Sequence, residues 1–356
     1  MKQLNQIYLV LLLFTSLQGC SSLSYYSQAI GGHVSLMMRN QPIDEVVQRP
    51  DIAPELRQSL LTAQTASTFA DKTLQLPVGG AFSGYVELEH PWVVVNLVAV
   101  PEFSLNPHQW CYPVAGCQAY RGYFDLEQAK QERQHFLQQG YDTLIGAVTA
   151  YSTLGWFDDP LHTGFTSLPE DRMVSLMFHE LAHRVVYLNG DTAFNESFAT
   201  AVELEGLRLW LESRGTPESF DQALKRLEHR NRTLELVQAT SEKLNQLYQS
   251  KSQLSPEQLR LGKKQALSEL SMQYEALSRH YPEPGPFGPP PVKLNNANLA
   301  IFQQYNQYVP AFRQLLRESD SDFKEFYKAV SQLSEQPVAE RQRTLDALSQ
   351  RFVEHF

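Results

Sequence analysis

The spacing of hydrophobic residues predicts helices in two long stretches of the chain. Within residues 21–75, apolar positions in Ile43–Leu61 and Thr62–Leu74 recur every three or four residues, the period of a helix with one buried face. Between Asp221 and Arg279, leucines recur at heptad-like intervals among Gln, Glu, Lys and Arg, interrupted at Ser255-Pro256. This second pattern predicts a long helical hairpin.

A different pattern separates these stretches and predicts strands. Tyr85–Leu88 and Trp92–Val100 are rich in β-branched and aromatic residues and are bounded by Gly and Pro. Asp125–Gln139 is a polar helix that we expect to end at a glycine. The segment Thr143–Phe157 is rich in small and β-prone residues and is interrupted by glycine. Glycine in a strand often marks the close approach of another backbone.

Two strong helices are predicted next, at Ser167–Leu188 and Thr192–Glu212. Ser167–Glu170 has the spacing of a capping box with proline in the first turn, so we expect the first helix to begin there. Pro282–Pro291 is a stiff connector, and helices resume at Leu294–Leu316 and continue towards the end. The fold class is α+β and mostly helical. The expected parts are a signal segment at 1–19, N-terminal helices, a sheet and a core at 20–214, a hairpin at 215–281, a connector at 282–293 and a helical region at 294–356.

The first twenty residues have the layout of an export signal. A basic start at Met1-Lys2 is followed by the apolar run Ile7–Phe14, which is too short to span a membrane, and then by Leu17-Gln18-Gly19-Cys20. A small residue before cysteine fits lipoprotein processing, after which Cys20 would carry the acyl chains; an ordinary signal peptide is the alternative. Ser21 follows the cysteine where aspartate could stand, and by resemblance to Gram-negative lipoproteins this favours the outer membrane, facing the periplasm.

Composition and cysteine content agree with an exported, folded protein. Among 356 residues the 19 Phe, 16 Tyr and 4 Trp argue against wholesale disorder. The formal net charge of -9 gives no electrostatic basis for binding nucleic acid.

Beyond Cys20 the two remaining cysteines, Cys111 and Cys117, flank a short turn with Pro and Gly. In an oxidising compartment this pair predicts a disulfide; a metal site is the weaker alternative, because no nearby histidine completes it.

The motif with the most chemical content is His179-Glu180-Leu181-Ala182-His183, of the form H-E-x-x-H. On a helix the two histidines lie on one face, so both imidazoles can bind one ion, which we expect to be zinc. A catalytic zinc site takes three protein ligands and keeps a position open. Glu180 lies beside the histidines and is placed to act as general base rather than as a ligand.

Hairpin geometry identifies Glu196 as the third ligand. Gly190 ends the first helix, the second runs back antiparallel, and Glu196 then lies level with His183. Thr200 and Glu203 follow on nearly the same face, where they can orient a ligating histidine through its other ring nitrogen. Asp191 is an alternative ligand, but it lies too near the turn to face the ion.

Three further residues are candidates for contacts with a substrate. The segment that precedes the motif helix has the character of an edge strand, and such a strand can hold a peptide by backbone pairing. Tyr151 and Gly155 lie in it; packing of an ordinary edge strand explains either residue equally well. Tyr305, which follows the polar run Asn295–Asn298, could donate a hydrogen bond to an oxyanion.

Seven segments carry a resemblance to a known family: Trp110–Cys117, Tyr120–Phe124, Gln139–Asp142, Tyr151–Pro160, His179–His183, Asn195–Thr200 and Asn295–Ala297. Through them the chain resembles the bacterial predicted-aminopeptidase lipoprotein family of the H-E-x-x-H zinc peptidase clan. This resemblance extends over nearly all of the chain after the signal segment. It implies a gluzincin-like, zincin-like core, with His179, His183 and Glu196 as zinc ligands and Glu180 as the catalytic base. The gap between His183 and Glu196 is shorter than in thermolysin-like enzymes.

The expected function is therefore zinc-dependent hydrolysis of peptide bonds by a lipid-anchored aminopeptidase. One alternative is an envelope endopeptidase for quality control, which uses the same site without recognising the α-amine. Another is a lipid-anchored scaffold with structural zinc, whose hairpin binds an envelope protein that the sequence does not identify. The presence of Glu180 speaks against the scaffold, because a structural site has no use for a general base.

Overall fold

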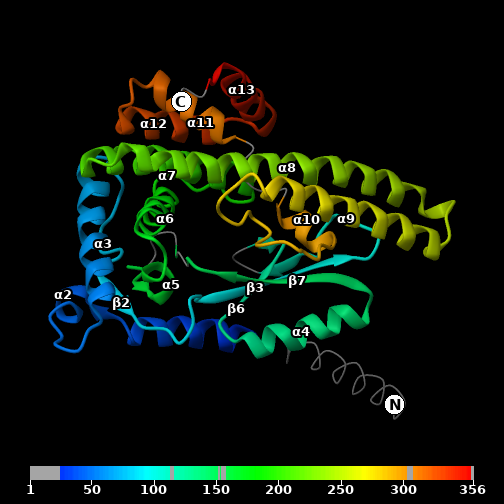
Figure 1. Cartoon of the computed structure of the whole chain (residues 1–356), viewed down its shortest axis with the longest axis horizontal. Helices are drawn as coiled ribbons and strands as arrows, with labels where there is room; N and C mark the ends of the chain where they lie inside the picture. The colour runs from blue at the N-terminus through cyan, green and yellow to red at the C-terminus, as the bar shows by residue number, and fades with distance from the viewer. Residues whose placement is uncertain (1–24, 113–115, 151–152, 154–157, 303–307, 354–356) are drawn as a thin grey trace, which may run out of the picture.

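The computed structural model describes residues 25–112, 116–150, 153, 158–302 and 308–353, and these are mainly helical with three small sheets (Figure 1). Residues 25–38 are helical. The strands are β1 (Gln41–Pro42), β2 (Gly84–Val86), β3 (Val94–Pro101), β4 (Trp110–Tyr112), β5 (Gly116–Gln118), β6 (Arg121–Tyr123), β7 (Tyr141–Val148) and β8 (Leu161–His162). The helices are α2 (Ile43–Val46), α3 (Pro54–Lys72), α4 (Leu126–Gln138), α5 (Thr163–Thr166), α6 (Glu170–Ala182), α7 (Thr192–Arg214), α8 (Phe220–Gln249), α9 (Pro256–Ser278), α10 (Asn296–Phe302), α11 (Val309–Glu318), α12 (Phe323–Ser334) and α13 (Val338–Arg351).

The main sheet has the strand order β6-β3-β7, and all its pairs are antiparallel. Alternate residues of β3 face opposite sides, as in any pleated strand. Val95 and Leu97 pack with α4 on one face, while Val98 and Val100 pack with α10 on the other. The sheet therefore lies between two helical layers, with the hairpin of α8 and α9 beyond α10 (Figure 1).

Asn296 joins the hairpin to the sheet. It is fully buried and accepts a hydrogen bond from the hydroxyl of Tyr248 on α8 at 3.0 Å. Its side-chain amide also donates to the carbonyl oxygens of Glu102 at 3.0 Å and Ser104 at 2.8 Å, just after β3. This residue of the predicted polar run therefore has a structural role.

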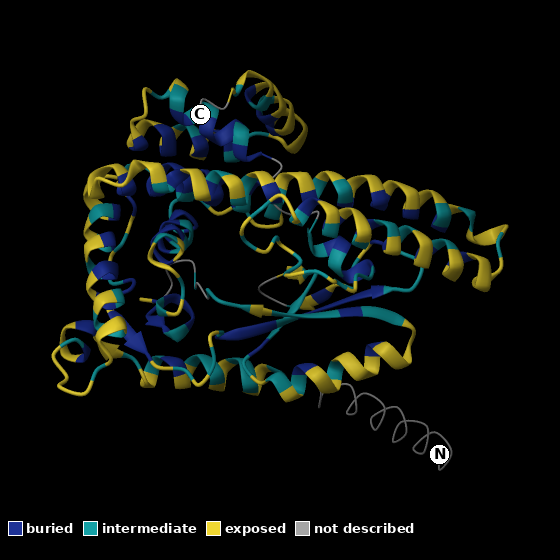
Figure 2. Ribbon diagram, viewed as in Figure 1, coloured by how far each residue is buried: buried dark blue, intermediate teal, exposed yellow. Residues whose placement is uncertain are grey.

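A second, larger core is mainly helical, with contributions from β2 and β8. It is built from α3, α6 and α7 and is covered by α11 to α13 (Figures 1 and 2). Gly206 on α7 allows a close approach, because a Cβ atom there would lie 2.8 Å from Leu74 and 2.9 Å from Phe178. The region around the H-E-x-x-H motif is thus packed on several sides.

Several predicted helix boundaries are wrong, and two of them lie at helix starts. The helix expected from Ile43 is broken after α2, and α3 begins at Pro54; Pro50 and Pro54 disfavour a continuous helix because each lacks the N–H donor. The capping box at Ser167–Glu170 does not form. Ser167 instead ends α5, Pro169 precedes α6 in an extended conformation, and no side chain caps the helix.

The helix expected at Leu294–Leu316 appears as two, α10 and α11. Most of the edge strand expected before the motif helix lies outside the described residues. The remaining predicted elements are present. The long hairpin consists of α8 and α9, and Ser255 and Gln258 form a capping box at the start of α9. Asp125 caps α4, and Gly140 follows that helix with a φ of 80°. No helix within the described ranges is long and apolar enough to cross a membrane.

Candidate metal centre

The two histidines of the motif lie at the C-terminal end of α6. The helix presents Met173, Met177 and Leu181 to the core, which leaves His179 and His183 together on the adjacent face. Their ring centroids are 4.9 Å apart and the ring planes are nearly perpendicular, at 81°. The helix ends at Ala182, earlier than the predicted Leu188, so that His183 is its C-cap.

The segment after α6 explains this early end. The side chain of Asn195 accepts a hydrogen bond from the amide of Leu188 and donates one to its carbonyl oxygen, both at 2.8 Å. These bonds tie the extended segment before Gly190 to α7, and Gly190 then turns the chain with a φ of 83°. Asp191 caps α7 at Phe194 and pairs with Arg341 at 2.8 Å, so it is not a metal ligand in this arrangement.

Glu196 on α7 faces both histidines. Its carboxylate oxygens lie 3.4 Å from Nε2 of His179 and 3.8 Å from Nε2 of His183. One potential ligand atom from each of the three residues lies within 4.8 Å of the others. Tetrahedral zinc with bonds of about 2.0–2.1 Å separates its ligand atoms by about 3.3 Å, so the group is close to the required size.

Glu203 lies on the other side of His179. Its Oε2 is 3.0 Å from Nδ1 of the imidazole. When Nδ1 carries the proton and donates it to this carboxylate, Nε2 presents its lone pair towards Glu196. Thr200 is buried on α7 between the two glutamates. Nδ1 of His183 is also buried but has no hydrogen-bond partner among the described residues. A hydrogen bond at Nδ1 therefore orients the ring of His179 but not that of His183.

The electrostatics of the group favour a cation. Burial disfavours the charged form of His179, but hydrogen bonds to Glu196 and Glu203 outweigh it and raise the pKa of His179 well above its usual value. Burial would raise the pKa of both glutamates, yet the hydrogen bond and charge of His179 hold each pKa below its usual value. Burial lowers the pKa of His183 to about 4, which keeps this imidazole neutral, as a metal ligand must be.

Glu180 has different surroundings from Glu196, although both lie close to the histidines. Burial raises the pKa of Glu180 to about 7, and the negative charges of Glu196, Asp159 and Glu203 add to the effect, while His179 opposes it. A carboxylate whose pKa lies near neutrality can both accept and return a proton. This is the property that a general base needs.

Two residues near the site were not predicted from the sequence. The positive charge of Arg230, on α8, contributes to lowering the pKa of Glu196 and of Glu203. Asp159, just before β8, is buried, and one of its oxygens accepts hydrogen bonds from the amide and hydroxyl of Thr153. Neither lies near the motif in sequence. The only available signal was the polar pair Asp158-Asp159 before an apolar strand.

Several predicted residues cannot be compared with the structure. Cys20, Tyr151, Gly155 and Tyr305 lie outside the described residues. Of the described residues after the gap that contains Tyr305, Tyr308 contacts α7: its amide donates to the hydroxyl of Ser197 at 3.1 Å.

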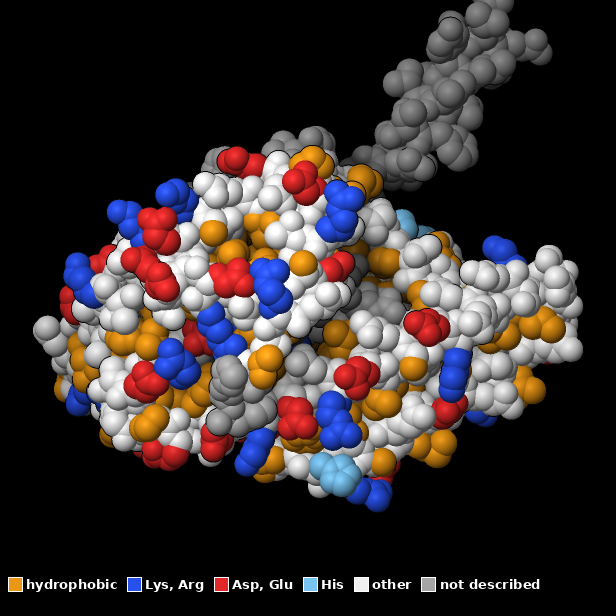
Figure 3. Space-filling view, turned by 90° about the horizontal axis from the view of Figure 1, so that it is seen from above, with side chains coloured by type: hydrophobic (Ala, Val, Ile, Leu, Met, Phe, Trp, Pro, Cys, Tyr) orange, Lys and Arg blue, Asp and Glu red, His pale blue; other side chains and the backbone are white. Residues whose placement is uncertain are grey.

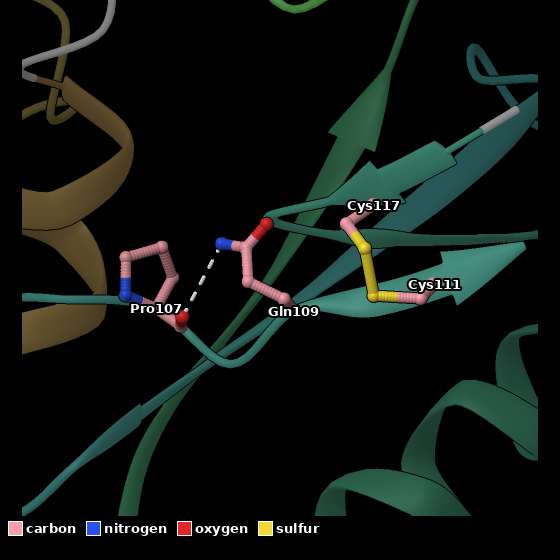
Figure 4. The surroundings of a disulfide bond; sticks show 4 residues. All are labelled: Pro107, Gln109, Cys111 and Cys117. Carbon is pink, nitrogen blue, oxygen red and sulfur yellow. Dashed lines mark hydrogen bonds between the residues drawn. A yellow bond between two sulfur atoms is a disulfide. The ribbon is translucent and has the colours of Figure 1, made fainter.

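The predicted disulfide between Cys111 and Cys117 is present (Figure 4). The two cysteines face each other across the antiparallel pair of β4 and β5. The bond therefore closes this small hairpin and has no part in the metal centre.

Fold and site together define an α+β, mostly helical protein with a His-His-Glu group that can hold a metal ion. A family model described as "putative aminopeptidase" matches residues 24–345, and the chain belongs to that family. No curated protein and no solved structure gave a match.

Proposed function

We propose that this chain is a zinc-dependent aminopeptidase that uses Glu180 as its general base. The observation that carries the proposal is the convergence of His179, His183 and Glu196, with Glu203 hydrogen-bonded behind His179. Membership of the aminopeptidase family supports peptide hydrolysis as the reaction. The donor atoms support the choice of metal, because two imidazoles and one carboxylate are a common set for catalytic zinc.

The proposed roles follow from position. Zinc, when bound, lowers the pKa of a water molecule towards about 7 and polarises a carbonyl group. Glu180 is adjacent to His179 but is not one of the three residues that converge, so it is free to take a proton from the attacking water and pass it to the leaving amine. Glu203 holds His179 in one ring orientation through the hydrogen bond at Nδ1.

Hydrolysis of paired peptides tests this proposal and separates an aminopeptidase from an endopeptidase. The full chain, loaded with zinc, should cleave a peptide with a free amino terminus and leave its N-acetylated counterpart intact. Equal cleavage of both would identify an endopeptidase. Cleavage that is unchanged after removal of zinc by a chelator would contradict the proposed chemistry.

We also propose that the protein is lipid-anchored in the bacterial envelope through Cys20. The support is the cysteine directly after Gly19 and an apolar segment, together with an internal disulfide, which is typical of exported proteins. Replacing Cys20 by serine should abolish labelling with a radioactive fatty acid. Unchanged labelling would show that the anchor, if there is one, is attached elsewhere.

A further inference from the structure

A cavity of about 410 Å³ lies beside the metal centre. Thr200 and Glu203 contribute to its wall, and Glu203 is one hydrogen bond from His179. The opposite wall comes from α8 and from the connector that follows α9. This volume falls in the usual range for ligand sites, about 300–1,000 Å³. We call it the basic pocket after the cations in its lining: Arg172, Lys225, Arg226 and Arg230.

The charge of the basic pocket is opposite to that of the whole chain. Four cationic side chains line it against two acidic ones, Glu203 and Glu283, whereas the chain carries a net charge of -9. On the face shown in Figure 3, by contrast, Lys and Arg side chains are interspersed with Asp and Glu. The concentration of positive charge in a cavity next to the metal centre is therefore a local feature.

Two of these cations are available to a ligand. Arg226 is already neutralised, because it pairs with Asp171 at 2.7 Å and with Glu283 at 3.0 Å. Arg172 on α6 and Lys225 on α8 are exposed and form no ion pair within the described ranges. They lie on different helices and both line the same cavity, so an anion inside it can meet positive charge from two sides.

The wall formed by the connector is fixed in place. Tyr281 stacks on His229 of α8 with ring centroids 4.2 Å apart and an angle of 7° between the planes. Gly285 approaches so closely that a Cβ atom there would lie 2.4 Å from the His229 ring. The proline-rich composition of residues 282–291 limits movement further. The basic pocket is thus preformed, which reduces the entropic cost of filling it.

We propose that the basic pocket binds a carboxylate of the peptide substrate and so gives the enzyme a preference for acidic peptides. This rests on the proposed function for the cleavage itself. The carboxylate can come from an Asp or Glu side chain or from the free carboxyl terminus of a short peptide. Arg172 and Lys225 attract it, and Thr200 and Glu203, which line the pocket, place it next to the metal centre on the far side of His179.

Binding and cleavage are measured on one set of short peptides. Each amidated peptide carries Glu, Gln or Lys at one of its first four positions, and a neutral peptide is supplied with either a free or an amidated carboxyl terminus. Binding is measured by calorimetry with the full chain carrying Glu180→Gln, so that no turnover interferes. Cleavage of the same peptides is measured with the zinc-loaded wild-type chain.

We expect a carboxylate to strengthen binding about five- to tenfold over its neutral counterpart, as two partly exposed ion pairs would give. The double variant Arg172→Gln with Lys225→Gln should remove this preference. Lys251→Gln, which removes an exposed charge at the tip of the hairpin, should keep it. A preference for Glu at one position identifies a side chain as the source, and a preference for the free terminus identifies the chain end.

The outcomes separate this proposal from the proposed function. Cleavage without any preference for carboxylates, or a preference that survives in the double variant, overturns the role of the basic pocket and leaves the peptidase intact. A preference in binding without cleavage by the zinc-loaded chain supports the basic pocket and rejects the peptidase.

Discussion

Two antiparallel helix pairs in this protein are built on different principles. The pair of α6 and α7 is enclosed, and α7 buries polar residues such as Asn195, Ser197 and Thr200 along with its apolar ones. The pair of α8 and α9 packs mainly through apolar residues such as Val237, Leu244 and Leu270, and its outward faces are exposed (Figure 2). The hydroxyls that α8 buries at Thr233 and Thr240 donate to carbonyl oxygens of their own helix. It also has an ion pair between the helices on its surface, Lys243 with Glu269 at 3.0 Å.

The difference follows from whether a helix pair has to hold polar side chains at defined positions. Buried polar groups are costly unless they are hydrogen-bonded. In α7 the buried polar groups have bonding partners that position neighbouring segments. Asn195 fixes the turn before α7, and Ser197 accepts a hydrogen bond from the amide of Tyr308. Glu205 pairs with the buried Arg313 at 2.8 Å. A mainly apolar seam, such as that of α8 and α9, stabilises a helix pair but fixes few polar side chains at defined positions. We therefore expect substitutions in α6 and α7 to change chemistry, and substitutions in the seam of α8 and α9 to change stability.

The largest expected effect is on turnover, at Glu180. Replacement by glutamine removes the general base, which should lower kcat by a factor of about 10²–10⁴. The fold and the zinc content should stay unchanged, because Glu180 is outside the converging group. Glu170→Gln, at the exposed start of the same helix, is the matched control and should have full activity. If the Glu180 variant keeps wild-type turnover, the proposed mechanism is wrong. An unchanged cellular phenotype in the Glu180→Gln variant would support the scaffold alternative.

A substitution in the seam of α8 and α9 should lower stability and leave the zinc content unchanged. Leu270 is fully buried in the seam, so Leu270→Ala should lower the free energy of unfolding by about 2–5 kcal/mol. Zinc content should not change. Leu261 on the same helix is 58% exposed, and Leu261→Ala should have little effect on urea unfolding. Loss of zinc in the folded Leu270 variant would show that the two pairs are not independent.

A smaller effect is expected at Glu203. Glu203→Ala removes the acceptor at Nδ1 of His179 and should weaken zinc affinity about 10- to 100-fold without abolishing binding. Glu212→Ala removes a carboxylate from the exposed end of the same helix, where it pairs with Arg208, and serves as the control. Competition with a chelator of known affinity measures both. Equal affinities for the two variants would mean that Glu203 does not support the ligand.

The sequence predicted the grouping of His179, His183 and Glu196 better than the helix boundaries around it. Residues four apart on a helix share a face in any context, which places His179 and His183 together. Antiparallel pairing of two helices joined by a short turn then places Glu196 opposite His183, so the sequence spacing was enough to predict this group. The end of α6 at Ala182 depends on the side chain of Asn195 reaching back to Leu188, a contact that no local propensity encodes. Arg230 and Asp159 come to the site from other elements, and only the tertiary fold brings them there.

The central claim is that His179, His183 and Glu196 hold one zinc ion, and zinc content measured by mass spectrometry tests it most directly. The full chain, dialysed after loading, should contain about one zinc per chain. His183→Ala should lose it, and Glu196→Gln should bind it more weakly, because a neutral amide is a poorer ligand than a carboxylate. Wild-type zinc content in a correctly folded His183→Ala variant would contradict the account.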